Sequence, residues 1–168
     1  MSLQIRTYDP ARDHDELRRC FIELQDHEHG FAPSSPTGAE IVDAYLAYML
    51  GRCATPDSAL WVAQLGDRVV GFASAIRVER PSPDDGDAFH FELGELSVLE
   101  EARDQGVGAA LVGAVERHAR AHGAPALRVS MGAGNPGAQR FYARLGFEPC
   151  VIMCERRLDA EDDPSAGS

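Results

Sequence analysis

Two glycines bracket one valine in RDQGVG, residues 103–108, a stretch between a strand-like apolar run and a long amphipathic run. A helix beginning here would present unpaired backbone N–H groups and partial positive charge, and both favour a phosphate group. Taken alone, the stretch is better explained as an ordinary flexible turn. It is not a P-loop, which requires Gly-Lys-Ser/Thr, and Gly113 follows too late for the dinucleotide fingerprint.

Carboxylates and histidines at two other places could carry acid–base or metal chemistry. Glu92 and Glu95 lie three positions apart in a strand-like run, on opposite faces if the strand is regular, and either could accept a proton. The stretch DHEHG, residues 26–30, places two histidines near acids. We interpret it as a solvated helix end, because so short a cluster is a weak metal signal, and we predict no metal.

Hydrophobic periodicity predicts the elements that must position these groups. Asp13 is expected to cap a first helix that runs to about residue 28, and Thr37 and Glu40 form a capping box for the second. The other expected elements are strands at 3–8, 59–65, 68–79, 88–99 and 126–131, two short strands near 147–150 and 151–158, and helices at 106–122 and 135–146. This order predicts a mixed α/β fold with an antiparallel first half.

Two motifs in this order resemble the Gcn5-related N-acetyltransferase (GNAT) family. The run ELSVLEEARDQGVGAALVGAVERHARAHG carries the family's main motif at Arg103, Gly106 and Gly108. The run NPGAQRFYARLGF resembles the second motif, with matches at Asn135, Phe141, Tyr142, Leu145, Gly146 and Phe147. The resemblance implies an acyl-CoA N-acyltransferase fold, in which a central, mostly antiparallel sheet with a splayed strand pair is flanked by about four helices. One acetyltransferase domain is expected over residues 1–158, followed by an acidic, disordered tail at 159–168.

The resemblance implies acetyl-CoA or coenzyme A as co-substrate. The pyrophosphate would lie on the N–H groups of residues 104–109, and the pantetheine arm would bond the backbone of the preceding strand at Leu96, Ser97 and Val98. The family splays this strand from the following one, and Gly94 is compatible with a local irregularity there. The remaining implied cofactor-binding residues are Arg103, Asp104, Gln105, Gly106, Val107, Gly108, Ala109, Asn135 and Tyr142. Asp104 is acidic where the family more often has glycine or a basic residue, so its side chain should face away from the phosphates.

The implied reaction is direct attack of a primary amine, from a small molecule, peptide or protein, on the thioester of acetyl-CoA. Tyr142 matches the family's general acid, although its helical face also fits a core position. Glu92 is our preferred base over Glu95, with a water-mediated route left open, and the Val98 N–H is the implied oxyanion donor. The alternative is a non-catalytic CoA-binding or regulatory domain.

Composition limits the partners. The net charge of −11 disfavours nucleic acid, and no apolar run is long enough to span a membrane. We expect a cytoplasmic protein whose acceptor is a cationic amine, attracted by Asp84, Asp85 and Asp87. The family often forms homodimers, and the sequence leaves that alternative open. The four cysteines are interpreted as reduced and mostly buried thiols.

Overall fold

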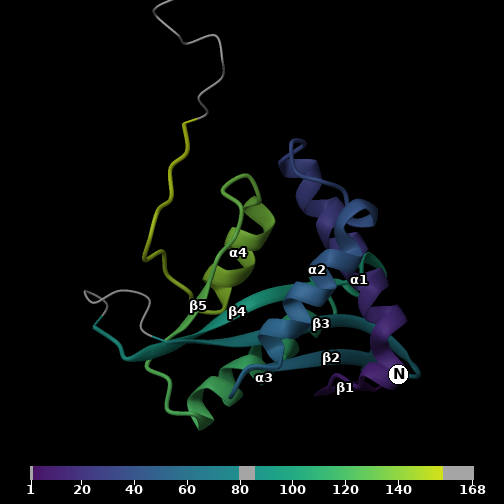
Figure 1. Cartoon of the computed structure of the whole chain (residues 1–168), viewed down its shortest axis with the longest axis horizontal. Helices are drawn as coiled ribbons and strands as arrows, with labels where there is room; N and C mark the ends of the chain where they lie inside the picture. The colour runs from purple at the N-terminus through teal and green to yellow at the C-terminus, as the bar shows by residue number, and fades with distance from the viewer. Residues whose placement is uncertain (1, 80–85, 157–168) are drawn as a thin grey trace, which may run out of the picture. The chain divides into compact units, whose positions relative to one another are not determined.

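The computed structural model describes residues 2–79 and 86–156, and the chain divides into two compact units, Met1–Pro136 and Gly137–Ser168. The first unit contains a five-stranded sheet in the order β1-β2-β3-β4-β5 (Figure 1). Neighbouring strands are antiparallel except β4 and β5, which are parallel. The elements are β1 (Leu3–Thr7), α1 (Pro10–Phe31), α2 (Gly38–Cys53), β2 (Ala59–Leu65), β3 (Arg68–Glu79), β4 (Phe89–Val98), the 3-10 helix η1 (Glu100–Ala102), α3 (Val107–Ala121), β5 (Leu127–Val129) and α4 (Pro136–Arg144). The predicted fold class is confirmed.

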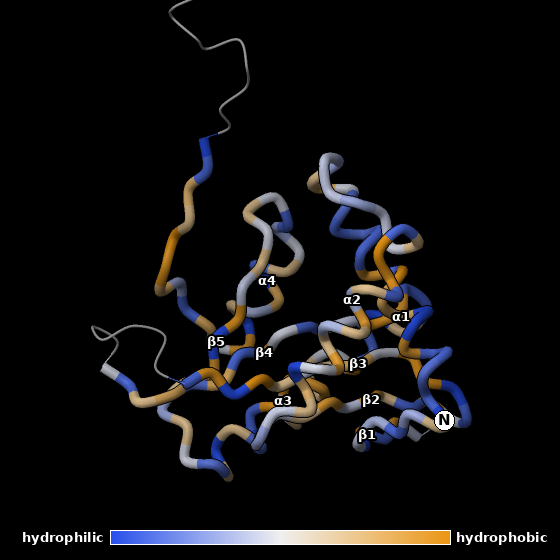
Figure 2. The backbone as a smooth tube through the Cα atoms, viewed as in Figure 1, coloured by the Kyte–Doolittle hydropathy of each residue, from blue (hydrophilic) through white to orange (hydrophobic). Residues whose placement is uncertain are grey.

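The core lies on both faces of the sheet. Helices α1 and α2 pack on one face and α3 packs on the other (Figure 1). In the central strand β3, residues 69–76 are all buried, as expected of a strand that helices cover on both sides. Figure 2 shows the hydrophobic colour along β2 and β3. The largest fully buried side chains include Leu17, Phe21, Val42, Met49, Phe72, Phe91, Leu111 and Val115.

Helix α1 begins earlier than its pattern predicted, so the expected cap at Asp13 is wrong. Asp9 is the N-cap: its carboxylate accepts a hydrogen bond from the Ala11 N–H at 3.0 Å, and Pro10 takes the first helical position, where no N–H is needed. Asp13 is buried instead and accepts hydrogen bonds of 2.6 and 2.8 Å from the Arg6 guanidinium. This ion pair joins β1 to α1.

A β-bulge interrupts β4 at Gly94, where the sequence was compatible with a local irregularity. Ser74 of β3 lies opposite two residues of β4, Gly94 and Glu95. A Cβ on Gly94 would lie 2.6 Å from the Ser74 hydroxyl oxygen, so the close approach of the two strands requires glycine. A bulge of this kind changes the face on which the following side chains lie.

The two short strands expected near residues 147–150 and 151–158 are wrong for the part of the second unit that the structure describes. Residues 147–156 are neither strand nor helix, and residues 157 and 158 lie outside the described ranges. A strand requires a hydrogen-bonded neighbour, and the described part of this unit contains no strand. The apolar side chains of Val151, Ile152 and Met153 are therefore 81–94% exposed.

The expectation of mostly buried thiols is only partly confirmed. Cys20 is buried and Cys53 is half-buried, whereas Cys150 and Cys154 are exposed. Burial raises the pKa of the Cys20 and Cys53 thiols to about 12 in each case. These two thiols are consequently protonated and unreactive near neutral pH.

Candidate functional site

The stretch RDQGVG forms a turn between β4 and α3 in which two residues adopt the left-handed conformation. Asp104 has a φ of +59° and Gly106, the N-cap of α3, has a φ of +80°. Aspartate tolerates this region better than most residues, and glycine enters it without steric cost. A Cβ on Gly106 would have no heavy atom within 4 Å. Backbone conformation, and not crowding, therefore explains the glycine.

The N-terminus of α3 presents backbone donors without a side-chain cap. The Ala110 N–H bonds to the Gly106 carbonyl at 3.0 Å and closes the first helical turn. The N–H groups of Val107, Gly108 and Ala109 come before any intrahelical acceptor, and no acidic residue lies in the first turn. This helix end is chemically suited to an anion.

The three residues before Gly106 are exposed and make different contacts. Arg103 donates from Nε to the Val98 carbonyl at 3.0 Å and from Nη2 to the Glu23 carboxylate at 3.4 Å. It thereby ties the turn both to the end of β4 and to α1. Gln105 donates its side-chain amide to the backbone of η1 at 3.0 Å. The Asp104 carboxylate makes no hydrogen bond or ion pair with any residue in the ranges 2–79 and 86–156, and its orientation relative to a phosphate stays a prediction.

Strands β4 and β5 are paired over only part of their length. Pairing runs from Phe91 to Leu93 of β4, and β5 is accordingly shorter than the strand expected at 126–131. After Leu93, none of the described strands pairs with this edge of β4. The bulge at Gly94 begins where the pairing ends, so the two strands separate at the irregularity.

The unpaired edge of β4 presents backbone groups of the segment Leu-Ser-Val. The Leu99 N–H donates to the Val70 carbonyl of β3 at 2.9 Å. Because N–H directions alternate along a strand, Leu96 and Val98 turn their N–H groups toward the other edge. The Ser97 hydroxyl donates to a carbonyl of α1 at 3.0 Å, so this side chain faces the helix layer. A polar, extended ligand could bond the Leu96 and Val98 backbone here.

The two candidate bases lie on the same face of the sheet, contrary to the expectation for a regular strand. Glu92 accepts a hydrogen bond from Arg52 at 2.9 Å and Glu95 accepts one from the Tyr45 hydroxyl at 3.0 Å, and both donors belong to α2. The bulge accounts for the difference. Glu95 is buried and also accepts a hydrogen bond from the Ser74 hydroxyl, whereas the Glu92 side chain is 39% exposed.

Further titratable groups surround the two carboxylates. Burial raises the pKa of the Tyr45 phenol above its ordinary range, and the neighbouring Glu95 carboxylate raises it further. His90 is buried two positions before Glu92, and its Nε2 lies 3.8 Å from a Glu92 carboxylate oxygen. Within the described residues its Nδ1 has no hydrogen-bond partner. Glu92 thus lies between Arg52 and His90.

The stretch DHEHG belongs to the last turns of α1, which extends beyond the predicted end at residue 28. Asp26 accepts a hydrogen bond from the Gly38 N–H at 2.7 Å, and His29 bonds a backbone carbonyl of the following loop at 2.7 Å. Glu28 accepts a hydrogen bond from the side-chain amide of Asn135 at 3.0 Å. Asp26, His27 and Gly30 are exposed, as expected of a solvated helix end, whereas Glu28 and His29 are half-buried and join α1 to neighbouring segments. No group of three or more metal-ligating side chains occurs among the residues that the structure describes.

Asn135 and Tyr142 lie in different units. Asn135 is buried in the first unit, immediately before α4. Tyr142 belongs to the second unit and is 7% exposed. Its ring packs against Phe141 and Phe147, with centroids 5.1 and 5.5 Å apart. These contacts agree with the core interpretation of Tyr142, while its role as general acid stays a prediction.

The acidic loop expected to attract the acceptor is described only at one end. Asp84 and Asp85 lie outside the described residues. Asp87 lies within them, and its carboxylate is 3.9 Å from the Arg128 guanidinium. The proposed attraction of a cationic acceptor therefore stays a prediction.

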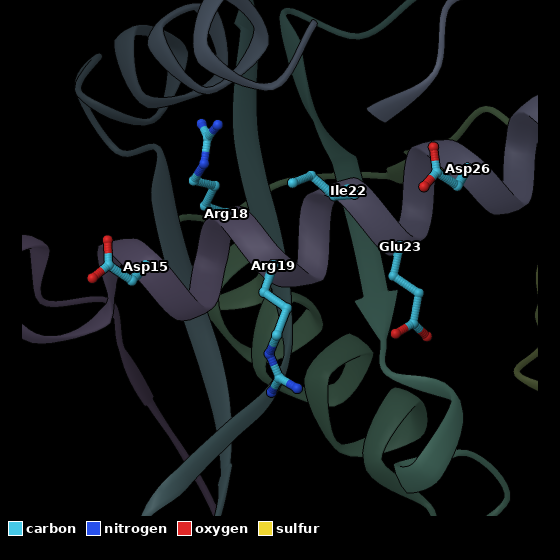
Figure 3. A pocket seen from close by; sticks show the side chains of 6 residues that line it. All are labelled: Asp15, Arg18, Arg19, Ile22, Glu23 and Asp26. Carbon is cyan, nitrogen blue, oxygen red and sulfur yellow. The ribbon is translucent and has the colours of Figure 1, made fainter. Parts of the chain in front are cut away.

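Figure 3 shows a pocket along the outer side of α1. It is lined by Asp15, Arg18, Arg19, Ile22, Glu23 and Asp26. Arg19 and Glu23 project toward the segment that joins β4 to α3, and Arg18 projects toward α2 (Figure 3). Glu23 is the lining residue that also contacts the turn.

Several residues around the candidate site were not identified from the sequence. Glu23, Arg52, Tyr45 and Ser74 all contact a predicted site residue from another element. Tyr45 lies in the second predicted helix, and its position there indicated no function. The other three stand in no local motif, because long-range contacts leave no spacing signal.

Comparison with known proteins identifies the fold and its relatives. The model of the acetyltransferase (GNAT) family matches residues 9–147. Among curated proteins, N-acetyltransferase 8 of Rattus norvegicus is 33% identical over 109 residues, covering 65% of this chain and 46% of that protein. N-acetyltransferase 8F1 of the same organism is 33% identical over 88 residues, which cover 52% of this chain and 38% of that protein. The chain therefore spans less than half the length of these curated relatives.

Solved structures share the fold at low sequence identity. The aminoglycoside N-acetyltransferase AAC(6′)-Iy in complex with CoA has a TM-score of 0.69 at 22% identity, covering 94% of this chain and 96% of that one. The glucosamine-6-phosphate N-acetyltransferase of Arabidopsis thaliana has a TM-score of 0.66 at 14% identity, covering 95% and 100%. A transcriptional regulator of Bacillus halodurans has a TM-score of 0.71 at 18% identity, covering 94% and 100%. Among the described residues, no helix has the length and apolar character that crossing a membrane requires.

Proposed function

Because the chain belongs to the acetyltransferase (GNAT) family, we propose that it transfers the acetyl group of acetyl-CoA to a primary amine by direct attack. The observation that carries this proposal is the uncapped N-terminus of α3, which follows a turn with φ of +80° at Gly106 and adjoins the unpaired edge of β4. A donor-rich helix end and an open strand edge suit, respectively, the pyrophosphate and the amide-containing arm of coenzyme A.

The residues around the turn fit coenzyme A. The N–H groups of residues 104–109 would receive the pyrophosphate, and the backbone of Leu96 and Val98 would bond the pantetheine arm. Open space over Gly106 leaves room for a phosphate close to the backbone. Arg103 would orient the turn through its bond to the Val98 carbonyl. The bound thioester supplies the activated acetyl group, and the protein supplies position and proton transfer.

The proton transfers follow from the chemistry of the reaction. The attacking amine must lose its proton, and we assign that proton to Glu92, directly or through water, because its carboxylate is more exposed than that of Glu95. As the C–N bond forms, the Val98 N–H would stabilise the oxyanion. As the C–S bond breaks, the thiolate of coenzyme A would take a proton from the Tyr142 hydroxyl. Glu95 accepts hydrogen bonds from the Tyr45 and Ser74 hydroxyl groups, and it would hold the shape of the bulge.

The charge of the chain and the names of its structural relatives support a small, cationic amine as the acceptor. Two of the solved structures with this fold are an aminoglycoside N-acetyltransferase and a glucosamine-6-phosphate N-acetyltransferase, each named for a small molecule that carries an amine. The net charge of −11 favours a cationic amine. A single domain over residues 1–158, a cytoplasmic location and a homodimer stay predictions beside it.

An acceptor screen tests the proposal. Amine-dependent release of coenzyme A from acetyl-CoA, with the acetylated amine detected by mass spectrometry, is the expected result for at least one class of primary amine. In the Tyr142→Phe variant we expect kcat to fall about 100-fold while the affinity for coenzyme A changes little. An unchanged kcat would remove Tyr142 from the mechanism.

One observation favours the alternative of a non-catalytic CoA-binding domain. Both candidate bases are engaged, Glu92 with Arg52 and Glu95 with Tyr45 and Ser74. Coenzyme A binding without turnover of any amine in the panel would select this alternative. Turnover that falls in Glu92→Gln, and not in a matched Glu16→Gln variant, would exclude it.

A further inference from the structure

Glu23 links α1 to the segment that carries the proposed pyrophosphate site. Its Oε1 accepts a hydrogen bond from the Glu100 N–H at 2.6 Å and another from the Arg103 guanidinium at 3.4 Å. Figure 3 shows the Glu23 side chain projecting from α1 toward this segment. A negative charge from a distant part of the sequence therefore lies beside the turn.

Arg103 is the basic residue of the turn, and its guanidinium group already has hydrogen-bond partners within the protein. One face of the guanidinium bonds the Val98 carbonyl at 3.0 Å through Nε, and Nη2 bonds Glu23. Within residues 103–109 the other charged side chain is the acid Asp104. Arg103, Asp104 and Glu23 together carry one more negative than positive charge.

The neighbouring cations do not neutralise Glu23. Arg19, one turn earlier on α1, lies 2.8 Å from Glu16 and 3.6 Å from Glu101. Arg68 lies 3.4 Å from Glu101. The carboxylate of Glu23 has Arg103 as its ion-pair partner among the described residues, and its side chain is 35% exposed.

We propose that Glu23 lowers the affinity of the chain for coenzyme A, because its carboxylate competes with the cofactor's phosphates for Arg103 and repels them. The proposal rests on the proposed function, since it takes the turn as the pyrophosphate site. Glu23 is thus a residue that tunes cofactor affinity from the opposite helix layer, and it keeps product coenzyme A from binding too tightly. The same contact orders the turn through the Glu100 N–H when no cofactor is bound.

The variant Glu23→Gln separates the charge from the hydrogen bond. Glutamine keeps an oxygen that accepts from the Glu100 N–H, so the turn retains its shape, while the negative charge is removed. We expect calorimetry to show coenzyme A binding about fivefold more tightly, the size expected for one screened, half-exposed charge near a phosphate group. If Glu23 had only a structural role, the variant would bind coenzyme A more weakly, because a loosened turn weakens binding.

Two controls make the test specific. Glu16→Gln removes the same charge from the same helix at a side chain of similar exposure, 40%, that does not contact the turn, and it should leave the affinity unchanged. S-acetylpantetheine lacks the pyrophosphate, so Glu23→Gln should not change its binding. Equal or weaker coenzyme A binding in Glu23→Gln, with an unchanged melting temperature, would overturn the inference. Absence of coenzyme A binding by the unmodified chain would instead overturn the proposed function.

Discussion

At the scale of single residues, the buried pair of Arg6 and Asp13 is the clearest case of charge fixing the fold. The Arg6 hydrogen bonds lower the pKa of Asp13 below its ordinary value, and the Asp9 N–H adds to the shift. A carboxyl group with a lowered folded-state pKa stabilises the protein above its unfolded pKa of about 3.9. That stabilisation is lost as the pH falls through the folded-state pKa.

We therefore expect Asp13→Asn to lower the free energy of unfolding by about 3 kcal/mol at pH 7, because Arg6 is left largely buried without its partner. The difference from the unmodified chain should shrink as the pH falls below about 4. Urea unfolding at several pH values measures both effects. Asp43→Asn is the control, since this exposed side chain pairs with Arg18 at the surface and should cost less than about 1 kcal/mol. Equal losses in the two variants would contradict the account.

The four cysteines differ in burial, and we expect them to differ in how fast their thiols react. With a pKa of about 12, the Cys20 and Cys53 thiols are almost wholly protonated at pH 8. A disulfide reagent should label the exposed Cys150 and Cys154 within the first phase, Cys53 more slowly and Cys20 only on unfolding. Mass spectrometry of the modified peptides identifies the order. Rapid labelling of Cys20 in the folded chain would contradict its buried position.

At the scale of elements, the bulge in β4 is the feature on which the candidate site depends. It places Glu92 and Glu95 on one face and begins where β4 and β5 separate. Gly94→Ala would bring a Cβ to 2.6 Å from the Ser74 oxygen and should cost about 2 kcal/mol of stability.

The matched control for the bulge is a second substitution on β3. Ser74→Ala removes that oxygen and leaves one hydroxyl fewer on buried Glu95. Combined with Gly94→Ala it should recover part of the lost stability, because the closest steric conflict is removed and only the 3.3 Å approach to Ile76 Cγ1 remains tight. Thermal unfolding of the single and double variants measures this coupling. Additive losses would contradict the role assigned to the close contact.

The sequence predicted elements where local pattern decides them. The hairpin strands 59–65 and 68–79 have the predicted bounds, and Thr37 and Glu40 do form the expected cap, with the Thr37 N–H donating to Glu40 at 2.7 Å. Asp13 was mistaken for a helix cap because Asp-x-x-Glu is a local cap signal, whereas its ion pair with Arg6 depends on tertiary packing.

Part of the candidate site, like part of the fold, could be predicted from local sequence pattern. The turn at Gly106 follows from glycine spacing and the helix after it. Gly94 indicated a local irregularity in the strand, but its form could not be predicted, since only the pairing with Ser74 defines the extra residue. The strands expected near 147–150 and 151–158 are absent from the described residues 147–156, because alternation describes one strand and a strand also needs a partner.

At the scale of the whole molecule, the net charge of −11 appears unsuited to a polyanionic cofactor. The fold resolves this conflict by placing oriented backbone donors at one helix end. These donors act at short range, where solvent and salt screen their attraction for a phosphate less than they screen repulsion by distant surface charges. Affinity should then depend on the geometry of the turn and on charges in contact with it, such as Glu23, and far less on the net charge of the chain.

Calorimetric titration of coenzyme A into the unmodified chain, Gly106→Ala and Gly113→Ala tests this central claim most directly. Gly106 needs a φ of +80°, which alanine disfavours by roughly 1–2 kcal/mol, whereas a Cβ on Gly113 in the body of α3 meets only the flexible end of Arg117 at 3.4 Å. The account predicts one site per chain, an unchanged affinity in Gly113→Ala and a loss of about tenfold or more in Gly106→Ala. Equal affinities in all three proteins, or no binding by the unmodified chain, would contradict it.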